Sequence, residues 1–288
     1  MNYVKSFKAR WKAYLVGLLV LSNIFVWVAV YQRQSGDILK IYFLDVGQGD
    51  AIFIDSPRHD RVLVDGGPNR KILAELGKIL PFADKRIDVM VETHPDKDHI
   101  GGLPEVVGRY KVGMFIAPGV ESENSIDDEL KKRIEQKNIP KILARRGMVI
   151  NFGDGAKLEI LFPTQDVSNW ETNKASIVAK LVYRDVSFLL TGDSPIPIED
   201  VLINLDPKIL DSDVLKAGHH GSRTSTSLEY TQAISPEYAV ISAGKDNTYG
   251  HPHKEVLDIL TKIGAKIVST AESGTIKFET DGKTLEIR

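Results

Sequence analysis

The sequence contains no cysteine among its 288 residues. This absence excludes disulfide bonds, zinc sites built on thiolates, and catalysis by a cysteine nucleophile. It decides nothing about the compartment, because a chain without cysteine is compatible with either side of a membrane. Any metal site must use carboxylate oxygen and imidazole nitrogen as ligands.

The chain also lacks a strong excess of charge of either sign, since its formal net charge is -2. Such a balance gives no general attraction to nucleic acid or anionic lipid, so a nucleic-acid contact would need a local patch or bound metal ions. Residues 131–146 offer such a patch, with seven basic residues and one acidic residue. A nucleic-acid track and a solvated helix face both fit this segment, and the solvated face is the more ordinary interpretation.

Internal repeats and low-complexity tracts are absent, and 42% hydrophobic with 26% charged residues is typical of a folded protein. One uncharged apolar run, residues 14–31, is almost long enough to cross a bilayer and has aromatic residues at both ends. Four basic residues precede it closely and one follows, which favours a cytoplasmic N-terminus. A cleaved signal peptide is the alternative, although the run is long for one and no small-x-small site follows it.

These patterns predict four parts of the chain. We expect a basic cytoplasmic N-terminus over residues 1–13, a transmembrane helix over 14–31, a linker over 32–37 and a folded domain over 38–288. In the folded domain, short apolar runs separated by turn residues predict an α/β protein. Strands are expected over residues 39–44, 51–55, 61–67, 87–91, 158–162, 177–183, 186–190, 212–217, 238–242, 266–269 and 275–278, and helices over 71–80, 103–107, 127–138 and 198–205 and after 226.

The densest group of potential metal ligands lies in residues 94–99. His94, Asp96, Asp98 and His99 fall within six consecutive positions, directly after the apolar run 87–91. We expect a tight loop at the end of a strand, where alternating side chains converge on one point. Carboxylate oxygen and imidazole nitrogen suit zinc, manganese or iron, and two such ions need at least this many donors. The ordinary alternative is a solvated polar turn.

Similar polar residues follow other strands. Asp193 comes just after the apolar strand 186–190, His219 and His220 follow the strand 212–217, and two more histidines lie in the loop 247–253. Six of the seven histidines therefore lie in three strand-end loops. Buried polar groups at such positions need partners, and a metal ion is a strong one.

Together these motifs resemble the metallo-β-lactamase fold, and more closely the C-terminal domain of ComEC/Rec2 competence proteins. The motifs are LDVGQGD at 44–50, HPDKDHIGG at 94–102, LTGD at 190–193, KAGHHGS at 216–222 and NTYGHP at 247–252. The resemblance covers residues 38–288. It implies a four-layer αββα sandwich of the α/β class with a metal site at one edge of the two sheets, here behind one N-terminal transmembrane helix.

The resemblance also implies two divalent metal ions, zinc or manganese. We expect the first ion on His94 and Asp96, the second on Asp98, His99 and His219, and Asp193 between them. His219 is preferred to His220 because it comes first after its strand.

Two departures from the family pattern affect the metal. Asp96 stands where the wider fold has a second histidine, and no histidine lies between His99 and His219, where the fold has another. Asn173 and Ser176 stand roughly at that place. Fewer nitrogen and more oxygen donors favour manganese over zinc.

The function implied is a membrane-anchored binuclear hydrolase that cleaves phosphodiesters, with DNA as substrate and a link to DNA uptake. ComEC proteins carry many membrane helices, whereas this chain has at most one, which argues against direct transport and leaves a separate channel or competence protein as a partner. One alternative is a non-catalytic nucleic-acid or envelope-binding module. Another is a phosphodiesterase acting on phosphorylcholine-type envelope polymers or small nucleotides. The enzyme would be a single-pass cell-membrane protein with its domain outside the cytoplasm.

Residue roles follow from this hypothesis. The predicted catalytic residues are Asp98, Asp193, His220 and His251, with the two histidines or His253 as proton donors to the leaving oxygen. The predicted substrate-binding residues are Asn173, Ser176, Ser222, Thr224, Ser225, Asn247, Tyr249 and His253. The residues predicted to support the site are Asp45, Gln48, Asp50 and Asp65.

Overall fold

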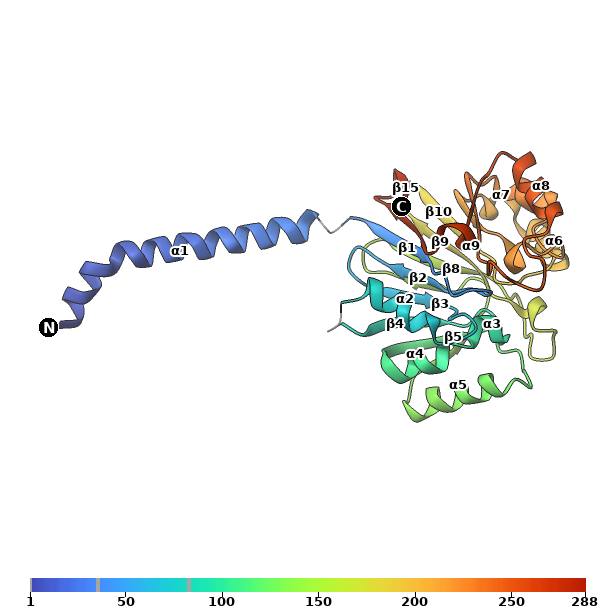
Figure 1. Cartoon of the computed structure of the whole chain (residues 1–288), viewed down its shortest axis with the longest axis horizontal. Helices are drawn as coiled ribbons and strands as arrows, with labels where there is room; N and C mark the ends of the chain where they lie inside the picture. The colour runs from blue at the N-terminus through green and yellow to red at the C-terminus, as the bar shows by residue number, and fades with distance from the viewer. Residues whose placement is uncertain (1, 35–36, 82–83) are drawn as a thin grey trace. The chain divides into compact units, whose positions relative to one another are not determined.

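The structure is a computed structural model, and it describes residues 2–34, 37–81 and 84–288. The chain forms two units, Met1–Ile38 and Leu39–Arg288, which are described separately. The helices are α1 Asn2–Gln34, α2 Lys71–Ile79, α3 Lys97–Ile100, α4 Leu103–Arg109, α5 Ser125–Gln136, α6 Ile196–Leu205, α7 Leu228–Ile234, α8 Lys254–Lys262 and α9 Thr270–Ser273, with 3-10 turns η1 Asn173–Ala175, η2 Pro207–Leu210 and η3 Gly218–Gly221 (Figure 1).

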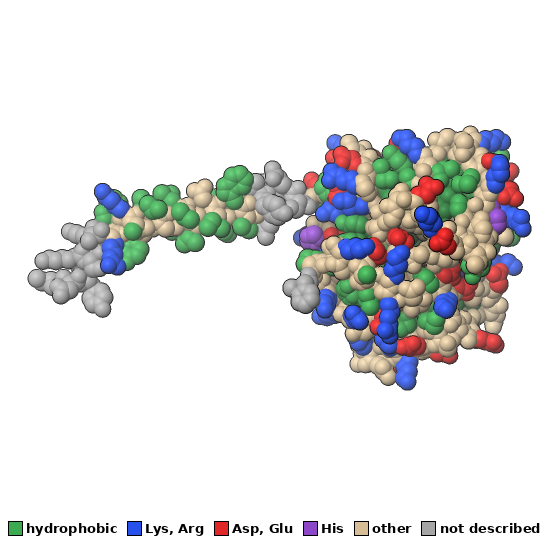
Figure 2. Space-filling view, viewed as in Figure 1, with side chains coloured by type: hydrophobic (Ala, Val, Ile, Leu, Met, Phe, Trp, Pro, Cys, Tyr) green, Lys and Arg blue, Asp and Glu red, His purple; other side chains and the backbone are tan. Residues whose placement is uncertain are grey.

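The first unit is built on the long helix α1. Its segment Arg10–Val28 is long and apolar enough to cross a membrane, a test that a signal sequence also passes. Figure 2 shows hydrophobic side chains along this helix. The helix continues through residues 32–34, where a linker was expected, because the glutamine and arginine residues there are good helix formers. Residues 35 and 36 of the expected linker lie outside the described residues.

The second unit contains two mixed sheets. The eight-stranded sheet has the order β15-β14-β1-β2-β3-β4-β5-β6, and the seven-stranded sheet has the order β13-β12-β11-β10-β9-β8-β7. We call them sheet A and sheet B. The strands of sheet A are β1 Leu39–Phe43, β2 Ile52–Asp55, β3 Arg61–Val64, β4 Arg86–Val91, β5 Lys111–Ala117, β6 Lys141–Leu143, β14 Ile276–Thr280 and β15 Leu285–Ile287. Those of sheet B are β7 Val149–Asn151, β8 Ala156–Phe162, β9 Val178–Tyr183, β10 Val186–Leu190, β11 Val214–Lys216, β12 Tyr238–Ile241 and β13 Lys266–Ser269.

Alternate residues of the strands enter different hydrophobic cores. In β2, Ile52 and Ile54 join the core between the two sheets, whereas Phe53 faces the helices outside sheet A. This follows from the two-residue repeat of a strand, whose successive side chains point to opposite faces. Both faces of the strand are therefore apolar, as in a sheet covered on each side.

Helices cover the outer face of each sheet. Side chains of α2, α4 and α5 form one core with sheet A, and side chains of α6, α7 and α8 form another with sheet B. A third core lies between the sheets. The predicted four-layer αββα sandwich is thus confirmed, with helices on the outside and the sheets facing each other (Figure 1).

Candidate metal centre

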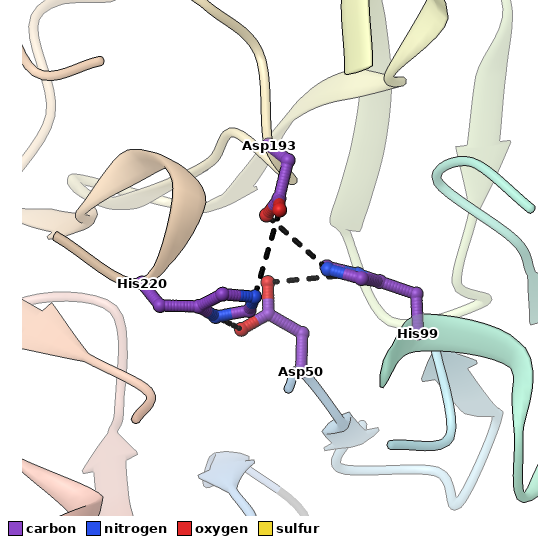
Figure 3. A group of neighbouring side chains, drawn as sticks. All are labelled: Asp50, His99, Asp193 and His220. Atoms are coloured by element: carbon purple, nitrogen blue, oxygen red, sulfur yellow. Dashed lines mark ion pairs between the residues drawn. The ribbon is translucent and has the colours of Figure 1, made fainter. Parts of the chain in front are cut away.

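The predicted polar loops meet at one edge of the two sheets. In sheet A, β3 and β4 run parallel, and in sheet B, β10 and β11 run parallel, so their carboxyl ends bring the following loops together. His99, Asp193 and His220 follow β4, β10 and β11, and Asp50 lies in the loop between β1 and β2. A ligand atom of each lies within 4.8 Å of the others. Figure 3 shows these buried side chains pointing toward one another.

Asp193 is the carboxylate around which the histidines gather. Its Oδ1 lies 3.2 Å from Nε2 of His99. Its Oδ2 lies 3.5 Å from Nε2 of both His219 and His220, and 4.0 Å from Nε2 of His94. One carboxylate thus faces four imidazole nitrogens.

His99 is oriented by Asp65, which was predicted to support the site. Nδ1 of His99 lies 2.8 Å from Oδ2 of Asp65. Thr93 donates its backbone N–H and its hydroxyl to the same carboxylate, at 2.8 and 2.6 Å. A carboxylate behind the ring is a common arrangement for metal-binding histidines, because it directs the second nitrogen to the ion. Nε2 of His99 accordingly faces Asp193.

The segment 94–99 is partly helical, whereas a tight loop was expected. Asp96 precedes the single turn α3, so Asp98 and His99 lie on a helix, and the backbone N–H of His99 donates to the Asp96 carbonyl at 2.9 Å. Oδ2 of Asp96 lies 3.7 Å from Nε2 of His94. The turn places Asp96 beside His94 and carries Asp98 away toward sheet B.

Asp98 meets His220, with Oδ2 3.2 Å from its Nε2. The other ring nitrogen of His220 donates to the Ser242 carbonyl at 2.9 Å, which holds the buried ring in place. His219 is more open, with 27% of its side chain exposed against 1% for His220. Its Nδ1 lies 3.2 Å from the Thr224 hydroxyl.

The two adjacent histidines point in different directions because of their backbone. His219 and His220 have φ of 47° and 56°, a left-handed conformation that non-glycine residues rarely adopt. Their rings stand 72° apart at 6.0 Å between centroids. Strain of this kind persists where the surrounding structure enforces it, commonly at functional sites.

Lys216 is a site residue to which sequence analysis gave no role. It is fully buried, forms an ion pair with Asp50, and lies 3.8 Å from Oδ1 of Asp193. It also donates to the Gly192 carbonyl at 3.0 Å. Burial works to raise the pKa of Asp50, but Lys216 and His220 lower it to about 2. Asp50, expected as a support, therefore lies inside the cluster as a carboxylate anion.

The carboxylates of the cluster stabilise positive charge on neighbouring groups. Burial lowers the pKa of His94 to about 3, so this imidazole is neutral. Burial acts in the same direction on His99 and His220, but Asp193 and neighbouring carboxylates raise the pKa of His99 well above its usual value and that of His220 to about 9. Without a metal ion, protonated imidazoles supply the cations between the carboxylates.

The donors fit divalent metal ions. Among the described residues, His94 Nε2, His99 Nε2, Asp50 Oδ1 and Asp193 Oδ1 are buried and complete no hydrogen bond. Buried polar atoms without partners are rare, and those in a native site call for a bound ion or water. Imidazole nitrogens and carboxylate oxygens that converge in this way suit a divalent cation.

Three residues predicted to bind substrate make hydrogen bonds that hold the loops of the site. The Ser176 hydroxyl accepts from the backbone N–H of Asp193 at 3.3 Å. The buried Ser225 hydroxyl donates to the Ser194 carbonyl at 2.8 Å. The Asn247 amide donates to the Gly244 and His251 carbonyls, which shapes its loop.

Other predicted substrate residues lie beside the histidines with freer side chains. Ser222 and Thr224 share a hydrogen bond of 3.0 Å next to His219. Tyr249 stacks on the His251 ring, with centroids 5.7 Å apart and planes 22° apart. The ring of His253 lies 4.9 Å from that of His251.

Three further residues complete the predicted set. Asn173, on η1, has an Oδ1 that is buried and makes no hydrogen bond. Gln48 Oε1 accepts from the backbone N–H of Gly244 at 3.1 Å, which joins the LDVGQGD loop to the loop after β12. Asp45 pairs with Lys71 on α2 at 2.8 Å, away from the histidine cluster.

Comparison with known proteins agrees with this geometry. The sequence model of the family described as "Metallo-beta-lactamase superfamily" matches residues 44–245. This range contains Asp50, His99, Asp193 and His220. The chain belongs to this superfamily. The crystal structure of the metallo-β-lactamase fold protein YhfI from Bacillus subtilis superposes with a TM-score of 0.52 at 13% identity, covering 82% of this chain and 98% of that one.

Curated relatives are competence and recombination proteins. The chain is 32% identical to ComE operon protein 3 of Bacillus subtilis (strain 168), over 83% of this chain and 33% of that protein. It is 29% identical to Recombination protein 2 of Haemophilus influenzae, over 91% of this chain and 31% of that protein. The chain thus spans about a third of the length of these relatives. The predicted resemblance to ComEC/Rec2 proteins is confirmed.

Proposed function

We propose that residues 38–288 form a binuclear metal-dependent phosphodiesterase that acts on DNA. The observation that carries this proposal is the arrangement of four histidines around the buried Asp193. Divalent ions in such a site activate water as a nucleophile and neutralise the charge that develops on a phosphoryl group.

We propose that the adjacent histidines serve different ions. His220 faces Asp98 at 3.2 Å, which supports one ion on Asp98, His99 and His220. His219 is the other histidine at 3.5 Å from Asp193 Oδ2. It would join His94 and Asp96 and supply the nitrogen that the sequence lacks between residues 99 and 219.

This assignment differs from the sequence-based preference for His219 on the second ion. That preference rested on the order of the two residues along the chain, whereas the present one rests on the contact between His220 and Asp98. Asp193 lies between both groups in either assignment. The oxygen-rich donor set favours manganese over zinc.

We propose that His251 contacts the leaving oxygen. Its ring lies 5.5 Å from that of His219, and its Nδ1 is buried without a hydrogen bond. Burial and the neighbouring His219 lower the pKa of His251 to about 4, so the ring is neutral at neutral pH. His251 would then offer a neutral N–H as a hydrogen-bond donor to the leaving oxygen.

The relatives support DNA as the substrate. Their names describe competence and recombination, and the chain matches them over most of its own length. The basic segment 131–146 adds less support, because Arg133, Lys137 and Arg145 donate to carbonyl oxygens of the chain itself. We infer that the metal centre provides the main attraction for phosphate, and that a separate channel or competence protein delivers the strand.

Hydrolysis by the full-length chain in detergent tests this proposal. Single-stranded DNA, double-stranded DNA and bis-p-nitrophenyl phosphate should be cleaved with manganese, and faster than with magnesium. Asp193→Ala should lower the rate by at least about a thousandfold, since it removes the carboxylate between both ions. Asp258→Ala, at an exposed position on α8, is the control and should change little. If metal-loaded protein cleaves none of these substrates, the binding-module alternative remains.

The apolar part of α1 supports a membrane anchor. We propose that the N-terminus lies in the cytoplasm and the folded domain outside, as the basic residues before the apolar run favour. Protease added to intact spheroplasts should then digest the domain. Complete protection of the domain would contradict this orientation.

A further inference from the structure

A cavity of about 540 Å³ lies beside the candidate metal centre, at the end of sheet B. Its wall is formed by the ends of β12 and β13, by α8 and α9, and by the loop that contains His251 and Pro252. None of the proposed metal ligands lines it. The volume falls within the roughly 300–1,000 Å³ of sites that bind small organic molecules.

The cavity and the metal centre share a wall. His251 lines the cavity, and its ring lies 5.5 Å from that of His219 and 6.3 Å from that of His220. Pro252 also lines the cavity and packs against Gly221, where an added Cβ would lie 2.7 Å from the proline Cβ. A group bound in the cavity would therefore sit next to a phosphate at the metal centre.

The lining combines apolar surface with a few polar groups. The apolar residues are Ile241, Pro252, Leu257, Ile267 and Ala271. Lys245, Ser269 and Glu272 add a cation, a hydroxyl and a carboxylate. A nucleobase has matching chemistry, because its faces are apolar and its edge carries both hydrogen-bond donors and acceptors.

A quaternary ammonium group fits this lining less well. Proteins bind such groups with the faces of several aromatic rings. Along the described wall of the cavity, His251 is the sole aromatic residue. A choline headgroup would therefore gain little from cation–π contact here.

We infer that this cavity is a nucleobase subsite, which holds the base next to the phosphate at the metal centre. The inference rests on the proposed function and adds a substrate class to it, namely nucleotides with an unpaired base. Tyr249, with 65% of its surface exposed, stacks on His251 and extends the aromatic surface outward. Stacking on such surfaces tolerates any base sequence.

Binding to the manganese-loaded full-length chain tests the subsite without turnover. Isothermal titration should compare thymidine 5′-monophosphate, 2-deoxyribose 5-phosphate and phosphorylcholine, which share a phosphate and differ in the attached group. We expect the nucleotide to bind at least about tenfold tighter than the other two. Equal binding of nucleotide and sugar phosphate, or tighter binding of phosphorylcholine, would overturn the inference.

Variants of the wall locate the effect. Ala271→Trp fills the cavity and should abolish the preference for the nucleotide while keeping the affinity for 2-deoxyribose 5-phosphate. Ala74→Trp, at an exposed position on α2, is the matched control. Lys245→Ala and Glu272→Ala change exposed side chains without filling the core, so they should each weaken the preference even if Ala271→Trp fails to fold.

Hydrolysis separates the failure of this inference from the failure of the proposed function. Thymidine 5′-(p-nitrophenyl phosphate) and methyl p-nitrophenyl phosphate release the same leaving group. Wild-type protein should cleave the thymidine compound with a kcat/KM at least about tenfold higher than that for the methyl compound. Ala271→Trp should lose this preference and still cleave the methyl compound. If neither substrate is cleaved, the proposed phosphodiesterase activity is refuted, and the binding comparison still decides whether the subsite exists. Equal cleavage of both refutes the subsite alone.

Discussion

Lys216 and Asp50 form a buried ion pair beneath the histidines, with 0% and 2% of their side chains exposed. Lys216 ends β11 in sheet B, whereas Asp50 lies in the loop that joins β1 and β2 of sheet A. A buried charge is tolerated when its partner stays in place. The pair therefore links the two sheets at the edge where the metal ligands meet.

Removal of this lysine should destabilise the protein strongly. Lys216→Met removes the lysine partner of the buried Asp50 carboxylate and leaves it only the histidines of the cluster, so we expect the free energy of unfolding to fall by about 3–5 kcal/mol. Asp50→Asn combined with Lys216→Met should recover part of the loss. Lys266→Met, in an exposed pair with Glu237, is the control and should change little. Urea unfolding measures all three, and equal effects of Lys216→Met and the control would contradict the role of the pair.

The metal content of two single variants should show how the histidines are divided. His219→Ala and His220→Ala should each retain about one ion per chain, because each removes a ligand of a different ion. His253→Ala should retain both, since it lies outside the proposed ligand sets. Mass spectrometry of the metal measures this ratio. Two ions in His220→Ala would return His219 to the second ion, as the sequence-based preference had it.

Gly49 is needed where the LDVGQGD loop passes Asp98. Its φ is 128°, and an added Cβ would overlap the backbone oxygen of Asp98. Gly47→Ala is a matched control, because Gly47 also has a positive φ but no atom within 4 Å of an added Cβ. We expect Gly47→Ala to cost about 1–2 kcal/mol. Gly49→Ala should cost more and also lower the metal content, and equal costs would show that the Asp98 contact is unimportant.

The stability of the metal-free protein should depend on pH through His220. Asp193 and Asp50 outweigh burial and raise its pKa from 6.5 to about 9, so the folded state holds this proton more tightly than the unfolded chain. The resulting stability is fully present below pH 6.5 and is lost as pH rises through about 9. Thermal unfolding after chelation should show a fall in Tm across this window. Manganese-loaded protein should show a smaller fall, because the ion replaces the proton as the local cation.

Local patterns predicted much of the fold. The bounds of β10 and β13 agree with prediction because apolar runs and their flanking turn residues are local signals. Lys111–Ala117, or β5, was missed, since a glycine interrupts its apolar run and no turn residue marks its start. Helix α8 was also missed, although the i, i+4 spacing of Val256 and Leu260 indicated an apolar face.

The sequence predicted which residues form the site better than it predicted how their side chains are arranged. Polar residues after strands identified Asp193 and the histidines, because strand ends bring distant loops to one edge. The directions of His219 and His220 depend on a left-handed backbone that their order along the chain does not show. Lys216 was missed because lysine at a strand end is ordinarily exposed, and its partner Asp50 is distant in the sequence.

The position of β1 within sheet A has a consequence for synthesis of the chain. β1 pairs with β2 on one side and with β14, Ile276–Thr280, on the other. On the ribosome, β14 emerges after all of sheet B has been made, so the nascent chain presents β1 as an unpaired edge open to other strands. Closure of sheet A is therefore a late event, and until β14 arrives the free edge of β1 is open to pairing with a strand of another chain.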